Sequence, residues 1–324
     1  MLLSLPPAGA AILSTAGAAL LTWLLLAALV PVLRRRLLDR PNARSSHQRP
    51  TPRGGGVAFV VVGSLLVAVL GEGRSALVPL LCCPLALVGL LDDRLNLPAA
   101  LRYGAQLLTA AALLALASTP LPLWTWPLLL IAITAVINFF NFMDGLDGLV
   151  AGCAVVLFGL VAALPGGRGL EPLAGSLIGF LAWNWSPARV FMGDVGSTWL
   201  GAVFAGLVLQ QRQPAQAAEL LLVALPLLAD ALVCVLRRLA AGQPVFQAHR
   251  LHLFQRLQQA GWAHRQVALL YGGATAVLAV GLRWGGAGTL LALAAGELAL
   301  GVGLDRRWAL SFRDATAAQQ SRQT

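Results

Sequence analysis

The sequence contains no lysine, and charged residues make up only 11% of its 324 positions. Hydrophobic residues make up 58%. An ordinary soluble domain carries about 25% charged residues. The composition therefore excludes that class and indicates a membrane protein.

Few cysteines and few familiar catalytic motifs exclude further classes. The four cysteines fall in apolar segments without a C-x-x-C spacing. We therefore interpret them as packing residues rather than as a disulfide or a zinc site. The chain has no GxxxxGK[ST], HExxH or GxSxG motif, which excludes the usual P-loop, zinc-protease and serine-hydrolase signatures.

Apolar residues occur in blocks of roughly 17 to 25, about the length with which a helix crosses a bilayer. We predict an all-α, polytopic integral membrane protein with about eleven transmembrane helices. The predicted spans are residues 9–33, 55–71, 75–91, 99–117, 122–139, 149–164, 172–185, 196–210, 217–236, 266–282 and 286–304. They form one transmembrane domain, 1–304, followed by a basic tail, 305–324, that we expect to be partly disordered. We expect the first span to be retained, because it lacks the features of a signal peptide.

The 23 basic residues are all arginines, and their positions predict the topology. If the N-terminus lies outside, all but four arginines (Arg74, Arg168, Arg212 and Arg283) fall on the inner side. The positive-inside rule then places the C-terminus in the cytoplasm. The basic charge thus reflects topology and requires no nucleic acid. The predicted cytoplasmic loops are residues 34–54, 92–98, 138–148, 186–195 and 237–265. Because the outer loops are short turns, we expect the chemistry on the cytoplasmic face.

The loop 34–54 combines several arginines, including Arg44 and Arg53, with a glycine triplet at 54–56. Glycine lets backbone N–H groups approach an anion closely, which favours a phosphate site. The alternative is a basic stop held by anionic headgroups, with glycines that pack helices together.

An acidic pair, Asp92 and Asp93, stands at the inner end of the third span. Neighbouring helical side chains point about 100° apart, so one carboxylate would serve a site and the other its scaffold unless the helix ends there. The alternative is a solvated helix end paired with Arg94 or Arg102.

Four polar residues recur at every third position before and within a glycine-containing segment: Asn138, Asn141, Asp144 and Asp147. On a helix they fan across one side, and such a fan can line a ligand pocket. We expect Gly145 and Gly148 to interrupt the helix and free backbone groups. The alternative is an interfacial turn with capping side chains.

Two further loops carry candidate residues. Asp194 stands between two glycines before a span, as a ligand or as a helix N-cap. Phe191 suits an aromatic residue at the membrane interface or a ring that stacks on a nucleotide base.

His249 and His252 share a helical face, which suits a phosphate clamp, a transition metal or no ligand. Zinc is the weakest of these, because the sequence offers no third nitrogen or sulfur ligand nearby.

The polar side chains of the predicted cytoplasmic loops include many carboxylates and amides, which offer oxygen ligands. Oxygen ligands favour a hard cation, with Mg²⁺ first and Mn²⁺ as the alternative. Mg²⁺ is usually shared between one or two carboxylates and the phosphates of a substrate. The pattern therefore indicates a phosphorylated substrate.

Five motifs in order resemble the polyprenyl-phosphate N-acetylhexosamine-1-phosphate transferase family, which includes MraY-, WecA- and WbpL-type enzymes. They are PNARSSHQRPTPRGGG, LLDDRLNL, NFFNFMDGLDGL, PARVFMGDVGS and HRLHLFQRL. The opening motif is most similar to the WbpL-like branch, which starts O-antigen or related glycans of the lipopolysaccharide.

The resemblance implies that undecaprenyl phosphate attacks a UDP-linked amino sugar, which yields a lipid-diphosphate sugar and UMP. It implies a Mg²⁺ site at Asp194 and Asp147 and a nucleotide pocket with Asn141, Asp144 and Phe191. Because bidentate arginine–phosphate pairing fixes geometry, Arg44, Arg53 and Arg102 are the candidates for binding the phosphate of the lipid. The residues that match the family's catalytic motifs are Asp92, Asp93, Asp144, Asp147, His249 and His252.

The acceptor phosphate constrains the mechanism. Its second pKa is about 6, so near neutral pH it is mostly a dianion that requires no strong general base. We therefore expect Asp92 or Asp93 chiefly to organise metal, arginine and acceptor.

A multi-pass transporter of a phosphorylated or anionic solute is the alternative to an enzyme, and a membrane scaffold is a weaker one. Transporters place ionisable residues near the bilayer midplane, whereas only Asp230 and Glu297 lie well inside spans. The sequence leaves open which sugar is used (GlcNAc, FucNAc, QuiNAc or GalNAc), although residues 239–264 are the expected reader. It also leaves a homodimer open.

Overall fold

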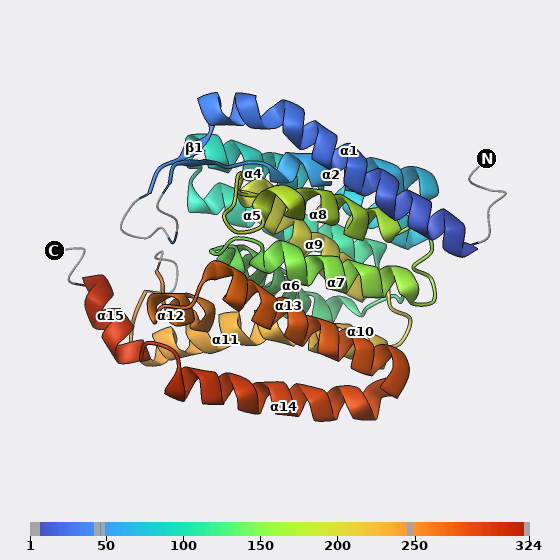
Figure 1. Ribbon diagram of the computed structural model, residues 1–324. Helices are drawn as coiled ribbons and strands as arrows, with labels where there is room; N and C mark the ends of the chain where they lie inside the picture. The colour runs from blue at the N-terminus through green and yellow to red at the C-terminus, as the bar shows by residue number, and fades with distance from the viewer. Residues whose placement is uncertain (1–6, 42–45, 47–48, 245–248, 321–324) are drawn as a thin grey trace.

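The structure is a computed structural model that describes residues 7–41, 46, 49–244 and 249–320 (Figure 1). In chain order its helices are α1 (Pro7–Arg36), α2 (Gly56–Leu70), α3 (Val78–Leu81), α4 (Cys83–Leu95), α5 (Ala99–Leu116), α6 (Trp126–Met143), α7 (Leu149–Ala163), α8 (Glu171–Asn184), α9 (Asp194–Leu209), α10 (Pro214–Val223), α11 (Leu225–Ala240), α12 (Leu253–Gln259), α13 (His264–Val280), α14 (Gly286–Arg307) and α15 (Phe312–Gln320). Short 3-10 turns, Arg74–Leu77 and Leu123–Thr125, precede α3 and α6, and a π-helical turn, Gly281–Gly285, joins α13 to α14.

The described residues contain β structure in one place. Strands β1 (Leu38–Asp39) and β2 (Thr51–Pro52) pair antiparallel, with Leu38 opposite Pro52 and Asp39 opposite Thr51. This ribbon follows α1 and places the segment before α2 against the end of the bundle. The all-α prediction is therefore confirmed for the fold class.

Each of the predicted apolar segments is helical, but the ninth is broken. Helices α10 and α11 meet at an angle of 80°. Pro226 lies in the first turn of α11, where its ring prevents the helix of residues 214–223 from continuing through Ala224. Judged by length and composition, the described residues hold five helices that can cross a membrane, or six with the bent pair.

Helix α9 is the centre of the molecule. Every residue from Val195 to Val208 is buried, and α9 packs against α2, α4, α5, α6 and α10. Glycines allow the closest contacts, since a Cβ at Gly201 would meet the backbone of Ile137 in α6. The start of α9 is thus held rigidly by its neighbours.

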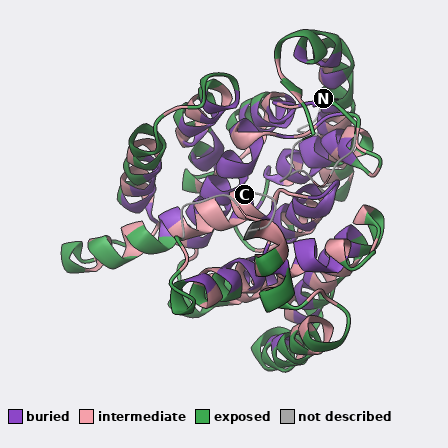
Figure 2. Cartoon of the chain, turned by 90° about the vertical axis from the view of Figure 1, so that its left-hand side faces the viewer, coloured by how far each residue is buried: buried purple, intermediate pink, exposed green. Residues whose placement is uncertain are grey.

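The outer surface of the bundle is apolar. Figure 2 shows buried residues gathered toward the middle and exposed residues on the outer faces of the peripheral helices. Exposed side chains there include Val69, Leu108, Leu128 and Ile131, which are between 66% and 79% exposed. Apolar surface of this extent requires a lipid environment.

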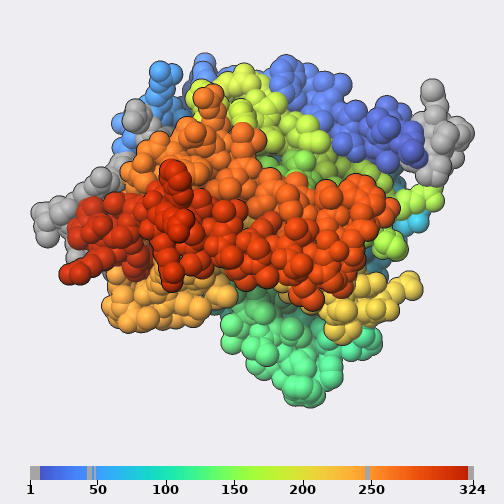
Figure 3. Space-filling model, turned by 60° about the horizontal axis from the view of Figure 1, so that its bottom comes forward, coloured from blue at the N-terminus to red at the C-terminus, as the bar shows by residue number. Residues whose placement is uncertain are grey.

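The two ends of the bundle differ. Helix α1 begins at one end, whereas β1, α12 and α15 lie at the other (Figure 1). Helices α13 and α14 form a hairpin on one flank, with α15 at its end (Figure 3). Although we expected partial disorder after residue 305, residues 312–320 are helical. Ala315 packs against Cys234 and Leu251.

Candidate active site

A cavity of about 290 Å³ lies at the end of the bundle that carries β1 and α12. It is lined by Asp39, Ser46, Arg53, Asp93, Asn141, Asp144, Gly145, Leu146, Asp147, Asn184, Phe191, Gly193, Asp194, Gln255 and His264. Each of the five loops predicted to be cytoplasmic contributes to this lining. The predicted convergence of Asn141, Asp144, Asp147 and Asp194 is therefore found.

Asp93 joins the end of α4 to the start of α9. Its carboxylate accepts the backbone N–H groups of Asp194 and Val195, at 3.1 and 3.3 Å. These are orphan donors at the N-terminus of a helix, where a negative charge is also favoured by the helix dipole. Gly193 has a φ of 73°, and a Cβ there would collide with the Asp93 carboxylate. Asp93 is therefore the cap of α9 as well as part of the cavity wall.

Arg53 covers the opposite side of Asp93. It donates to the backbone carbonyl of Asp93, and its Nε lies 3.8 Å from Asp93 Oδ1. The Arg53 side chain remains 33% exposed. Its charge is thus fixed at the cavity but remains accessible to an anion. Arg44, another predicted phosphate contact, lies outside the described residues.

Asp92 points elsewhere, as neighbouring positions on a helix require. It accepts the N–H of Leu97 at 2.6 Å and lies 3.0 Å from Nη1 of Arg102. Among the described residues the cavity lining does not include Asp92, although its carboxyl is close enough to hydrogen-bond with that of Asp194. Arg102 and the α4–α5 loop hold the Asp92 carboxylate, so the pair is divided as helix geometry predicted, and a catalytic role for Asp92 stays a prediction.

The glycines after α6 interrupt the helix as expected. Helix α6 ends at Met143, and Gly148 is left-handed, with φ 74° and ψ −7°. The N–H of Gly148 donates to Asn184 Oδ1 at 3.0 Å, and Asn184 Nδ2 donates to the carbonyl of Val190 at 2.9 Å. These bonds join the 144–148 loop to the segment that carries Phe191.

The polar fan on α6 divides between two neighbours. Asn141 lines the cavity and accepts a hydrogen bond from the Ser197 hydroxyl at 2.8 Å. Asn138 instead exchanges hydrogen bonds with Gln106 of α5, at 2.7 and 3.2 Å. The fan therefore supplies three cavity residues and one helix-pairing residue.

Phe191 sits beside the glycine triplet. Its N–H donates to the carbonyl of Pro52 at 2.8 Å, and its carbonyl accepts the N–H of Gly55 at 2.9 Å. A Cβ at Gly56 would collide with the backbone of Gly196. The glycines thus let α2 approach α9 closely, which is the packing alternative for the triplet.

Asp147 forms a pair with a histidine that sequence reasoning missed. Its Oδ2 lies 3.2 Å from Nδ1 of His264 and accepts the N–H of Ala188 at 3.1 Å. Burial alone would raise the pKa of the Asp147 carboxyl, but the hydrogen bonds from His264 and Ala188 lower it below its usual value. Because His264 and the N–H of Ala188 both contact Oδ2 of Asp147, they fix the orientation of this carboxylate. The available signal for His264 was its place at the end of the loop 237–265.

His249 and His252 do not take the expected place. Within the part of the chain that the structure describes, the cavity lining includes neither residue, whereas Gln255 and His264 face the cavity. His252 is only 2% exposed, and its Nδ1 lies 3.8 Å from Oδ1 of Asp230. Their rings stack on each other at 4.9 Å beside α11, and the catalytic assignment of both histidines stays a prediction.

Asp230 explains this arrangement. Its carboxylate accepts the N–H groups of Leu253 and Phe254, at 2.7 and 3.0 Å, and the Tyr271 hydroxyl at 2.7 Å. The aspartate thus caps α12 from α11. Capping holds the start of α12 and the preceding residue, His252, against α11, and Gln255 faces the cavity.

Among the described residues that line the cavity, the aspartates carry more negative charge than Arg53 balances. Burial and the charges of Asp194, Asp93 and Asp147 raise the pKa of the Asp144 carboxyl to about 8. A hard divalent cation would relieve this repulsion, so the donor set fits Mg²⁺. Among the described residues, however, no three carboxylates bring ligand oxygens within 4.8 Å of one another. The arrangement therefore fits an ion held by one or two carboxylates together with phosphate oxygens.

Comparison with known proteins decides the family. Residues 75–211 match the family model for glycosyl transferase family 4. A phospho-N-acetylmuramoyl-pentapeptide-transferase from Synechococcus sp. (strain JA-3-3Ab) is 34% identical over 84% of this chain and 90% of its own. The chain belongs to glycosyl transferase family 4.

Other members of glycosyl transferase family 4 are similar at comparable levels. A decaprenyl-phosphate N-acetylglucosaminephosphotransferase from Mycobacterium leprae is 32% identical over 75% of each chain. An undecaprenyl-phosphate alpha-N-acetylglucosaminyl 1-phosphate transferase from Yersinia pestis is 30% identical over 75% of each chain. The segment matched by the family model contains Asp93, Asp144, Asp147 and Asp194, whereas Arg53, Gln255 and His264 lie outside it.

Proposed function

We propose that this enzyme transfers an N-acetylhexosamine 1-phosphate group from a UDP-activated sugar to undecaprenyl phosphate, releasing UMP. The product, a polyprenyl-diphosphate sugar, would start a cell-surface glycan such as the O-antigen of a WbpL-like pathway. The observation that carries the proposal is one carboxylate-rich cavity built by five loops at one end of an apolar helical bundle. Family relatives that act on polyprenyl phosphates support the same reaction.

We place the cavity on the cytoplasmic face of a bacterial inner membrane, with about eleven crossings, the N-terminus outside and the C-terminus inside. The support is the arginine distribution, since the loops that build the cavity belong to the arginine-rich side of the chain. UDP-sugars are made in the cytoplasm, so this orientation also gives the donor access.

Asp194 and Asp144 would hold Mg²⁺, or Mn²⁺ in its place, with the diphosphate of the donor. When bound, the ion would neutralise charge on the phosphoryl oxygens and on the departing UMP. Asp147 is the less suitable ligand in this arrangement, because its Oδ2 is already shared by His264 and Ala188. The Asp147–His264 pair instead orients the wall of the cavity beside the donor.

Arg53 would bind the acceptor phosphate. Its guanidinium is held by Asp93 yet remains partly exposed, which fixes the geometry that an arginine–phosphate pair requires. Both Asp93 oxygens face N–H donors of α9. Asp93 therefore organises the acceptor side, and the phosphate dianion attacks without a strong general base.

Asn141 and Phe191 would bind the uridine, with Phe191 stacking on the base. Gln255, which projects from α12, is the candidate reader of the sugar. The histidine-bearing segment before α12 sets the position of Gln255, so the choice of sugar depends on residues in the predicted loop 237–265.

The test is transfer of radiolabelled sugar phosphate from UDP-GlcNAc, UDP-GalNAc, UDP-FucNAc and UDP-QuiNAc to undecaprenyl phosphate by the purified protein. We expect lipid-linked product from one or two of these donors, dependent on Mg²⁺ and abolished by Asp194→Asn. Absence of product with every donor would refute the reaction. Counterflow of a phosphorylated solute in proteoliposomes without product formation would establish the transporter instead.

A further inference from the structure

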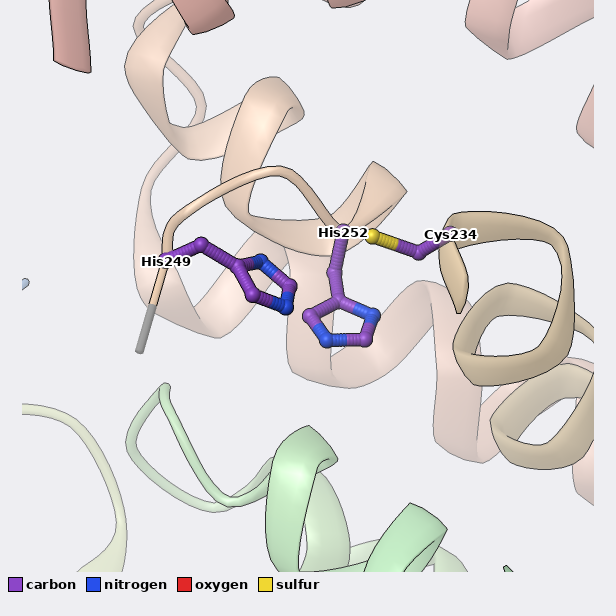
Figure 4. A group of neighbouring side chains, drawn as sticks. All are labelled: Cys234, His249 and His252. Atoms are coloured by element: carbon purple, nitrogen blue, oxygen red, sulfur yellow. The ribbon is translucent and has the colours of Figure 1, made fainter. Parts of the chain in front are cut away.

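A second group of potential ligands lies beside the carboxylate cavity. It consists of Cys234 of α11 with His249 and His252, which precede α12. One ligand atom from each residue lies within 4.8 Å of the others. Figure 4 shows the two imidazole rings side by side, with the Cys234 sulfur next to His252. Among the described residues, none of the three lines the carboxylate cavity.

Two of the three side chains are deeply buried. Cys234 is a free thiol that is 3% exposed, and His252 is 2% exposed. Nδ1 of His252 is buried and makes no hydrogen bond to any described residue, since Asp230 Oδ1 lies 3.8 Å from it. Nδ1 of His249 accepts the N–H of Leu251 at 3.3 Å. Buried polar groups normally have hydrogen-bond partners, and a ligand shared with the thiol would provide one for His252.

The donor chemistry identifies the class of that ligand. A sulfur and two imidazole nitrogens select a borderline metal such as Zn²⁺, whereas the oxygens of the cavity suit Mg²⁺. Bonds of about 2.0 Å to nitrogen and 2.3 Å to sulfur separate the ligand atoms of a tetrahedral zinc by roughly 3.3 to 3.5 Å, which is compatible with three atoms that lie within 4.8 Å of one another. The sequence lacked a third ligand near the histidines because Cys234 precedes His249 by a loop, and only folding brings it there.

The surroundings also suit a cation. Asp230 Oδ1 lies 3.8 Å from Nδ1 of His252. Its charge offsets that of the metal and helps to orient the histidine. The opposing charges are those of Arg237 and Arg238, which both interact with Cys234. Arg237 is itself paired with Asp305, so a thiolate and the Asp230 carboxylate together outweigh Arg238.

We propose that Cys234, His249 and His252 supply three ligands of a zinc site that fastens the segment before α12 to α11, with the fourth position open to water. The ion would also order the contact with α15, because Cys234 packs against Leu251 and Ala315. The site is independent of the transfer reaction. It would nevertheless set the position of Gln255 at the cavity, since α12 begins directly after His252.

The experiment uses the full-length protein in detergent, purified through an affinity tag without histidines. Elemental analysis should find about one zinc per chain after removal of loosely bound metal. Replacement by Co²⁺ should give the near-ultraviolet band of a thiolate–cobalt bond. Cys234→Ser should remove this band, whereas the matched change Cys153→Ser, at another buried cysteine, should leave it intact.

The measurements on the unaltered protein decide the outcome even if Cys234→Ser fails to fold. Less than about 0.2 zinc per chain together with a cobalt spectrum that lacks the thiolate band would overturn the proposal. So would zinc that Cys234→Ser retains in a folded protein. Loss of zinc does not require loss of transfer activity, so the result is read separately from the proposed reaction.

Discussion

Two polar regions at the same end of the bundle have opposite chemistry. The cavity collects oxygen donors from β1, α4, α6, the α6–α7 loop and α9, while the segment before α12 brings nitrogen and sulfur together with α11. Asp93 and Asp230 explain the difference, because each caps a helix and thereby sets which way the next side chains point. A capping aspartate thus does more than stabilise a helix end; it determines which residues reach the cavity.

The comparison predicts its largest effect at Asp194. Removal of this charge eliminates the proposed metal ligand, so Asp194→Asn should lower transfer by on the order of 10³-fold or more. Steady-state assays with saturating Mg²⁺ measure the change. Asp314→Asn, at an exposed aspartate of α15, is the matched control and should retain full activity. An active Asp194→Asn enzyme would remove the cavity from the reaction.

The next largest effects are expected at Asp93 and Asp92. They test whether one carboxylate of the acidic pair serves the cavity and the other serves the scaffold. Asp93→Asn should lower activity by about 100-fold and also destabilise the protein, since a helix cap is worth about 1 to 2 kcal/mol. Asp92→Asn should cost less activity, because Arg102 holds Asp92 outside the cavity lining. The measurements are kcat, Tm and a pH–rate profile of both variants. Loss of the acidic limb, with activity recovered at high pH, would identify a general base and contradict the organising role.

Two histidine variants compare the cavity with the segment before α12, because His264 lies in the first region and His249 in the second. His264→Gln should lower kcat by about 10- to 100-fold, the usual cost of losing a residue that orients a functional carboxylate. His249→Gln should have a smaller effect on kcat, because only His264 lines the cavity and reaches Asp147. Assays of both variants at a temperature where each is folded test the order. The reverse order would support the sequence-based assignment of the histidine motif.

These residues also show how far sequence reasoning reaches. The eleven apolar segments and the glycine interruption at Gly148 were predictable, because length, hydropathy and glycine act locally. The loops that meet at the cavity were predictable from arginine topology and from the motifs. The division of the acidic pair was also predictable from helix geometry, with Arg102 among the expected partners of Asp92. The place of His252 was not, because it depends on Asp230 and Cys234, which lie in another helix. The role of His264 was missed for the same reason, since Asp147 precedes it by more than a hundred residues.

Removal of metal should expose the repulsion within the cavity. Burial and the neighbouring carboxylates raise the pKa of Asp144 to about 8 in the folded state, above the 3.8 of an ordinary aspartate. The native state therefore keeps a proton that the unfolded state releases, so the stability of the metal-free protein should fall as pH rises from about 4 to about 8. Thermal denaturation in EDTA should show this decrease in Tm. Asp144→Asn should flatten it.

Mg²⁺ should counter the same effect, because the ion competes with protons for the carboxylates. The increase in Tm on adding Mg²⁺ should therefore be larger near pH 8 than near pH 5. Ca²⁺ and Na⁺ at matched ionic strength separate specific binding from general screening. An increase that does not depend on pH would argue against a metal on the Asp144 side of the cavity.

The smallest effect is expected at Asn138, which belongs to the same motif as Asn141 but faces the neighbouring helix. Its amide exchanges two hydrogen bonds with Gln106, at 2.7 and 3.2 Å. Asn138→Ala leaves Gln106 without these partners, so the protein should lose about 1 to 2 kcal/mol of stability. Activity should stay within about three-fold of the unaltered enzyme, as for other changes away from the reacting groups. Asn141→Ala is the contrasting variant, because it removes a side chain from the cavity lining and should raise KM for the UDP-sugar. If Asn138→Ala instead raised KM while leaving Tm unchanged, the division of the fan into a packing residue and three cavity residues would be wrong.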